Sequence, residues 1–147
     1  MNREMSISKS SQKNWIAEVE LQIPFHDVDM MEVAWHGHYS KYFEIARCAL
    51  LDKLDYNYPQ MRDSGFAWPV IDLRIRYIKP LSFQQRIIVR AEVAEYENRF
   101  KINYLVRDRD SGQNLTKGYT VQVAVDMLRG EMLFASPPIL LNKLGVA

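Results

Sequence analysis

The sequence predicts an α+β domain with one long helix and five or six antiparallel strands. Most of the chain alternates apolar and polar residues with a period of two, which is typical of half-buried strands. Only residues 37–54 show the 3.6-residue period of an amphipathic helix. Because the strands are segregated from a single helix, a curved antiparallel sheet with the helix laid across one face is the simplest arrangement.

Length and composition indicate one globular domain. The 147 residues are 48% hydrophobic and 25% charged, which excludes a disordered tail, a coiled coil or a fibrous repeat. We expect a single domain over 1–147, with 1–13 flexible because this start is polar and rich in Ser and Lys. No apolar run approaches the roughly 18 residues of a transmembrane helix, and the N-terminus lacks the apolar stretch of a secretory signal.

Net charge bears on possible binding partners, and cysteine content bears on the cellular compartment. Nineteen basic and eighteen acidic side chains leave a net charge of +1, so nothing favours nucleic acid or an anionic membrane. The single cysteine, Cys48, cannot form an internal disulfide and suits a reducing compartment. We therefore expect a cytoplasmic protein.

The elements follow in order along the chain. Apolar residues alternate from Trp15 to Phe25, which predicts a first strand that ends near Pro24. A polar, aperiodic loop occupies 26–38 and leads into the helix. The apolar positions of the predicted helix share one face: Tyr39, Tyr42, Phe43, Ala46, Ala49, Leu50 and Leu54. An irregular stretch is expected from there to Gly65. The remaining predicted strands cover 71–77, 87–93, 100–106, 119–125 and 132–135, with turn residues between them.

The loop is the natural place to look for chemistry. All three histidines of the chain lie in it with three carboxylates: His26, Asp27, Asp29, Glu32, His36 and His38. The first N–H groups of a helix have no partners within the helix and carry partial positive charge. A carboxylate at Asp29 facing such a helix start would form a minimal acyl-transfer site, with a nucleophile or general base beside an oxyanion hole.

The residues alone leave other interpretations open. Asp29 could simply cap the loop, and His36 could be a solvated histidine near a helix start. The loop cluster could bind a metal ion, although His36 and His38 lack the i, i+4 spacing of helical zinc motifs. Glu44 is a rival base on the helix itself, unless it forms an ion pair with Arg47.

Three segments resemble the hot-dog-fold acyl-CoA thioesterases of the 4-hydroxybenzoyl-CoA thioesterase type. That family opens with an aromatic residue, any residue, Asp, Thr or Cys, and Asp, and has a His or Tyr at the start of the helix. Residues 25–29 and His36 resemble this pattern, with Val28 in the place of Thr or Cys, and 43–47 match the family's aromatic-Glu-any-Ala-Arg run. Residues 76–81 and 117–126 are similar to two of its strands. The resemblance spans about 18–128 in the right order.

The resemblance implies roles for individual residues. Asp29 matches the carboxylate that attacks the thioester carbonyl or activates water. His36 matches the residue whose backbone N–H polarises that carbonyl, and Tyr39 matches an aromatic residue that shapes the acyl pocket. Trp35 is a further candidate for that pocket. Among the basic residues near these segments, Lys79 is the candidate for contact with the phosphates of coenzyme A, with Arg74, Arg76 and Arg86 as rivals by position.

Two departures from the family stand in the same loop. The family often has Ala-Gly after the catalytic Asp, where this chain has Met30-Met31-Glu32, so the loop geometry is expected to differ. The family commonly has Asn where this chain has His38. The two methionines, with Trp35, could line a long or aromatic acyl pocket, because methionine adapts to irregular apolar ligands.

These observations predict an acyl-thioester hydrolase that needs no cofactor or metal and acts on an acyl-CoA or acyl-carrier-protein thioester. The same fold could instead bind acyl thioesters without turnover, or dehydrate a β-hydroxyacyl chain with His36 as the base. A homodimer is the minimum assembly that the resemblance implies, and a homotetramer is the alternative. The identity of the acyl group stays open.

Overall fold

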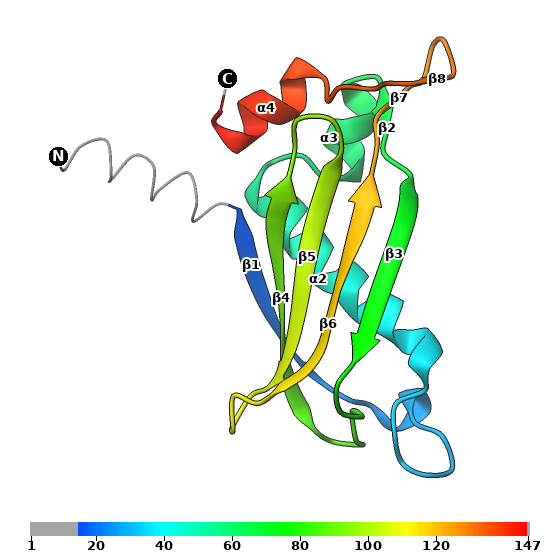
Figure 1. The fold of residues 1–147 in the computed structure, drawn as a ribbon, viewed down its shortest axis with the longest axis vertical. Helices are drawn as coiled ribbons and strands as arrows, with labels where there is room; N and C mark the ends of the chain where they lie inside the picture. The colour runs from blue at the N-terminus through cyan, green and yellow to red at the C-terminus, as the bar shows by residue number, and fades with distance from the viewer. Residues whose placement is uncertain (1–14, 147) are drawn as a thin grey trace, which may run out of the picture.

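A five-stranded antiparallel sheet is the main element of the computed structural model, which describes residues 15–146 (Figure 1). The strand order is β1-β4-β5-β6-β3, and every neighbouring pair is antiparallel. Their bounds are β1 Ile16–Gln22, β3 Val70–Tyr77, β4 Arg86–Glu95, β5 Phe100–Asp108 and β6 Asn114–Gln122. The predicted α+β class is confirmed, whereas the prediction of a flexible start lies outside the described residues.

One long helix, α2 (Tyr39–Lys53), lies across one face of the sheet, behind it in Figure 1. A 3-10 turn, η2 (His36–His38), leads directly into it. Phe43 is fully buried and its ring stacks on Tyr104 of β5 with the ring centroids 4.3 Å apart. The predicted helix over 37–54 is therefore confirmed, because its apolar stripe has to cover the core face of the sheet.

Smaller elements were not predicted. The expected irregular stretch before Gly65 contains α3 (Tyr58–Asp63), whose start has a capping box between Asn57 and Gln60. The strand predicted over 132–135 is shorter in the structure: it is β8, which belongs to a small three-stranded sheet with β2 and β7. The added elements are η1 Phe25–Asp27, β2 Phe66–Ala67, β7 Val125–Asp126, β8 Glu131–Met132 and α4 Pro138–Leu144. No helix within 15–146 is long and apolar enough to span a membrane.

Strand β6 differs from its sequence pattern. It begins at Asn114, five residues before the predicted start, and its helix-facing side chains are polar. Thr120 faces the helix side and is within 2.8 Å of the Tyr104 hydroxyl, whereas Val121 lies on the opposite face, paired with Lys101. Alternation therefore identified the strand, but the apolar Val121, although buried, lies on the face away from the helix.

Strand β3 forms one edge of the sheet and pairs only with β6 within the described chain. Its alternation of apolar residues was predicted correctly, and the Tyr77 ring at its end contacts Tyr39 of α2. Leu73 and Tyr77 are about half exposed, at 45% and 50%, and only Ile75 on this strand is partly buried. An edge strand with apolar side chains and unpaired backbone groups is available for pairing with another chain.

Candidate active site

The loop between η1 and η2 is closed on itself by backbone hydrogen bonds. The Asp29 N–H donates to the Val33 carbonyl at 3.0 Å, and the Trp35 N–H donates to the Asp27 carbonyl at 2.9 Å. Two further backbone bonds tie the loop to residues 81–83, which follow β3. The loop is therefore held in one place beside the start of the helix, rather than projecting freely.

Asp29 uses one carboxylate oxygen to cap this loop. Its Oδ1 accepts from the Met31 N–H at 2.8 Å and from the Val33 N–H at 3.4 Å. Its Oδ2 accepts no hydrogen bond from residues 15–146, and the side chain is exposed. The capping interpretation of Asp29 is thus correct for one oxygen, while the other oxygen is left available for chemistry.

The tight turn of this loop is made by Glu32. Glu32 has a φ of 60°, in the left-handed region that favours glycine, and its N–H donates to the Asp29 carbonyl at 2.9 Å. The loop therefore turns tightly without glycine, at the cost of a strained backbone at Glu32.

A cavity of about 300 Å³ opens beside this loop, and all five residues selected from the sequence line it. Three separate segments supply them: Asp29 from the loop, Trp35, His36 and Tyr39 from the start of the helix, and Lys79 from the segment after β3. The other lining residues are Val33, Ala34, Tyr77, Ile78 and Pro80. Residues up to 50 positions apart in the sequence thus meet at one site.

Aromatic rings form much of the cavity wall. The Trp35 and His36 rings have centroids 5.1 Å apart, and the rings of Tyr39 and Tyr77 meet edge to face at 4.8 Å. Burial raises the pKa of the Tyr39 phenol, so this ring stays uncharged at neutral pH. Such a wall suits an apolar group, while Asp29 and Lys79 provide charges at its rim.

The start of the helix contributes hydrogen-bond donors to the same cavity. The backbone N–H groups of His36 and Gly37 donate to no acceptor within 15–146, as expected in a first helical turn. Gly37 has no side chain to shield its amide, and the Trp35 ring occupies the space where a Cβ would stand. The carboxylate of Asp29 and the electropositive end of the helix therefore border one space.

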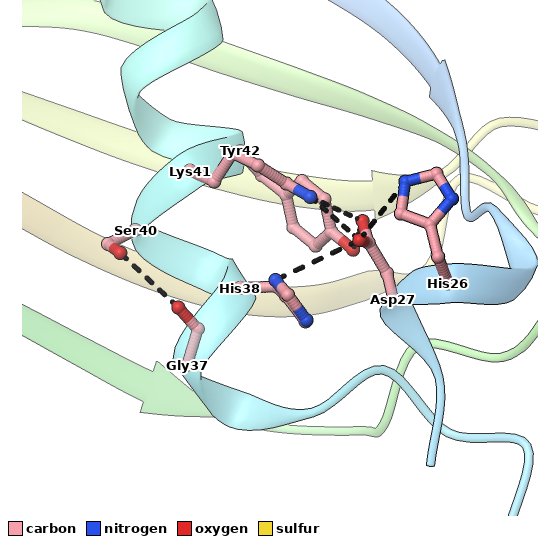
Figure 2. A network of polar contacts seen from close by, with 7 residues as sticks. All are labelled: His26, Asp27, Gly37, His38, Ser40, Lys41 and Tyr42. Carbon is pink, nitrogen blue, oxygen red and sulfur yellow. Dashed lines mark hydrogen bonds and ion pairs between the residues drawn. The ribbon is translucent and has the colours of Figure 1, made fainter.

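Asp27 has contacts beside the site that sequence reasoning missed, because it entered the sequence analysis only through the family motif and a possible metal cluster. Its side chain is only 1% exposed and accepts hydrogen bonds from Lys41 Nζ at 2.7 Å and from the Tyr42 hydroxyl at 2.7 Å (Figure 2). Burial opposes ionisation, but these hydrogen bonds outweigh it and hold the pKa of Asp27 below its ordinary value. No local spacing signals this contact, since 14 residues separate Asp27 from Lys41.

Two expectations about nearby residues were wrong. Met30 and Met31 do not line the cavity; they are 99% and 81% exposed at the tip of the loop. Glu44 forms no ion pair with Arg47 and does not border the cavity. Arg47 is buried instead, with its Nη1 donating to the Tyr104 hydroxyl at 3.3 Å, because its side chain turns inward beneath the helix.

The histidines do not gather around a single point. His26 and His38 both approach Asp27, at 3.6 and 3.8 Å (Figure 2). The His36 ring instead lies tilted beside the Trp35 ring at the cavity. Across the described part of the chain, no three His, Cys, Asp or Glu side chains converge as metal ligands.

Comparison with known proteins places this geometry in a family. Residues 23–144 match the model of the Thioesterase-like superfamily. YneP of Bacillus subtilis, assigned by name to the acyl-CoA thioesterases, is 30% identical over 89 residues, or 60% of this chain and 64% of that protein, less than two thirds of its length.

Solved structures share the hot-dog fold. A 1,4-dihydroxy-2-naphthoyl-CoA thioesterase from Synechocystis superimposes with a TM-score of 0.78 at 18% identity, covering 88% of this chain and 96% of that one. A DHNA-CoA thioesterase from Staphylococcus aureus gives a TM-score of 0.73 at 26% identity, covering 81% and 80%. With a family model matching most of its length and a hot-dog fold, this chain belongs to the Thioesterase-like superfamily.

Proposed function

We propose that the protein hydrolyses an acyl thioester to a free acid and a free thiol, with Asp29 as the nucleophile or general base. One observation carries this proposal: Asp29, which keeps one carboxylate oxygen free of described partners, and His36 at the start of the helix line the same aromatic-walled cavity. A thioester needs little more, because its thiolate is a good leaving group and requires little acid assistance.

The chemistry follows from that pairing. In the general-base route Asp29 takes a proton from water, and the oxygen of that water forms a bond to the thioester carbon. The carbonyl oxygen becomes an oxyanion, which the N–H groups of His36 and Gly37 stabilise by hydrogen bonds. The oxyanion then collapses, the C–S bond breaks, and the thiolate leaves with the proton from Asp29. In the nucleophilic route Asp29 itself attacks the carbon, the C–S bond breaks and the thiolate leaves. Water then hydrolyses the resulting mixed anhydride to the free acid and the Asp29 carboxylate, and the proton released goes to the thiolate.

We propose coenzyme A as the thiol carrier, with Lys79 as its contact. Lys79 stands at the cavity rim and forms no ion pair with any described carboxylate, so it can bind a phosphate. Its rival Arg86 pairs with Glu20 at 3.4 Å and does not border the cavity. A structurally similar Staphylococcus aureus protein, with a TM-score of 0.79 at 10% identity over 88% of this chain and 82% of that one, was solved in complex with CoA. The single cysteine supports a cytoplasmic location, where such a substrate would occur.

The decisive experiment follows thiol release from a panel of aliphatic and aromatic acyl-CoAs. The wild-type protein should release free thiol from at least one of them, and Asp29→Asn should release it far more slowly. Tight binding without thiol release would show an acyl-binding protein instead. Absorbance from a conjugated product without free thiol would show a dehydratase.

The role of Lys79 can be separated from the chemistry by changing the substrate. Lys79→Gln should raise KM for an acyl-CoA about tenfold and leave KM unchanged for the matching N-acetylcysteamine thioester, which carries no phosphate. Arg86→Gln is the matched control and should change neither KM. An equal rise in KM for both substrates would assign Lys79 to the acyl or thioester contact.

We also propose that two copies pair along β3 in a homodimer, as the family resemblance implies. Several features support this: the strand is an edge, its apolar side chains are exposed, and Tyr77 at its end lines the cavity. A second copy would therefore border the reacting group.

Light scattering on the purified protein tests the pairing. The wild type should have the mass of a dimer, or of a tetramer built from dimers. Leu73→Lys should lower the mass to that of a monomer, because it places a charge on the exposed face of β3. The matched surface change Leu128→Lys, at the tip of the β7–β8 hairpin, should keep the wild-type mass. A monomeric wild type would refute the pairing.

A further inference from the structure

Asp27 is a buried carboxylate that the proposed reaction does not use. It lies two residues before Asp29, yet it is almost completely buried while Asp29 is exposed. An ionised group is costly to bury unless partners compensate its charge. The partners of Asp27 should therefore indicate what its burial achieves.

All of its strongest partners come from the beginning of α2. Lys41 Nζ lies 2.7 Å from Oδ1 and 2.8 Å from Oδ2, and the Tyr42 hydroxyl donates to Oδ2 at 2.7 Å. Figure 2 shows these two side chains reaching from the helix to Asp27, with His38 on the same side and His26 on the other. Short hydrogen bonds to an ionised group are about twice as strong as neutral ones. The loop is thus joined to the helix by a charged contact.

The backbone of Asp27 is also the base of the loop that carries Asp29. Its carbonyl accepts from the Trp35 N–H, so the two ends of the loop meet at this residue. Trp35 in turn precedes the N–H groups of the helix start. A displacement of Asp27 would therefore move Asp29 relative to the donors that face it across the cavity.

We propose that Asp27, Lys41 and Tyr42 form a clamp that sets the distance between the Asp29 carboxylate and the N–H groups at His36. Asp27 is in this view a positioning residue and does not touch the substrate. The inference rests on the proposed function, because it concerns the geometry of the same site. A displacement of about 1 Å between reacting groups can cost about 100-fold in rate, so a clamp of this kind affects kcat.

The test compares Asp27→Asn, Lys41→Met and the double variant with the wild type. Each single variant should lower kcat at least tenfold and change KM less than threefold, because substrate contacts are intact. The double variant should be no slower than the slower single variant, since both changes remove one contact. Lys41→Arg should recover most of kcat. Lys143→Met, which breaks the exposed pair with Asp55, is the control and should leave kcat unchanged.

Hydrogen exchange provides a readout that does not need activity. Asp27→Asn should speed amide exchange in residues 28–36 and leave β4 and β5 unchanged, which also shows that the variant is folded. Tyr42→Phe keeps the ring in the core. It should lower kcat less, and speed amide exchange in the loop less, than Asp27→Asn does. A kcat within twofold of wild type in Asp27→Asn would overturn the clamp, as would a lower kcat without faster exchange in the loop. If the wild type releases no thiol, the proposed function fails, whereas faster exchange would still support the clamp as the contact that holds the loop.

Discussion

Two loops at the same end of the sheet are capped by an aspartate in nearly the same way (Figure 1). In the loop before η2, Asp29 Oδ1 accepts from the N–H of Met31 at 2.8 Å. In the turn between β5 and β6, Asp108 Oδ1 accepts from the N–H groups of Asp110 and Ser111, both at 2.9 Å. The bond from a backbone N–H two residues ahead is common to both, so a local pattern of hydrogen bonds cannot tell them apart.

The difference between the loops lies in the second carboxylate oxygen. Asp108 Oδ2 accepts from Gln85 Nε2 at 2.9 Å, so both of its oxygens are bound. This bond and those from Ser111 and Asp110 lower the pKa of Asp108 to about 2. Asp29 keeps an oxygen free of described partners and borders a cavity. The comparison teaches that a capping aspartate becomes a candidate catalyst when one of its carboxylate oxygens accepts no hydrogen bond and its side chain borders a cavity.

The largest expected effect comes from removing the negative charge in each loop. Asp29→Asn should lower kcat/KM about 100-fold or more, equivalent to about 3 kcal/mol of transition-state stabilisation, and keep the loop capped. Asp108→Asn should keep kcat/KM within twofold and lower Tm. Thiol release and thermal unfolding measure both variants. Comparable losses of activity would remove the distinction between the loops.

Asp108→Asn should also change how the stability of the fold depends on pH in acid. A carboxyl with a lowered pKa stabilises the fold at any pH above its unfolded value of about 3.9, and that stabilisation is lost as the pH falls through about 2. Asp108→Asn should therefore unfold with a weaker pH dependence between about pH 4 and 2 than the wild type.

A smaller effect is expected at the glycine of each loop, for different reasons. A Cβ on Gly37 would lie 2.2 Å from the Trp35 ring, so Gly37→Ala should displace this cavity residue and lower kcat/KM about tenfold. Gly112 has open space around it but a φ of +74°, so Gly112→Ala should cost about 1 kcal/mol of stability and no activity. Activity assays with chemical denaturation distinguish the two. An unchanged kcat/KM in Gly37→Ala would show that the Trp35 position is unimportant.

The smallest expected effect concerns the strained turn at Glu32. Glu32→Gly should stabilise the protein by up to about 1 kcal/mol, because glycine accepts a φ of 60° without strain, and should leave kcat within twofold. Gln84→Gly, at a φ of 69° outside the loop, is the control and should stabilise by a similar amount. A fall in kcat for Glu32→Gly alone would show that strain in this loop holds Asp29 in position.

Sequence reasoning recovered the loop and the helix because their signals are local. The 3.6-residue stripe of α2 and the polar interruption before it depend only on neighbouring residues, so they survive in any tertiary context. Asp29, His36 and Tyr39 then followed from the match to the family's motif, Trp35 and Lys79 from residue type and position, and all five line one cavity. A capping box at Asn57 and Gln60 was equally local and could have revealed α3.

Other features had no local signal. The contact between Asp27 and Lys41 depends on a 3-10 turn that brings the loop against the helix. The polar side chains on the helix-facing side of β6 show that alternation identifies a strand but not the face that the helix covers. Met30 and Met31 have the composition of a pocket wall, yet they lie at the exposed tip of the loop.

The sequence by itself determined which segments become strands or helix and which loop carries a carboxylate next to a helix start, since periodicity and spacing are properties of the chain. Only the tertiary structure decided that Asp27 is buried, that one oxygen of Asp29 stays free and that Lys79 reaches the same cavity. Those outcomes depend on contacts between residues far apart in the chain, and such contacts exist only after the sheet and helix have packed together.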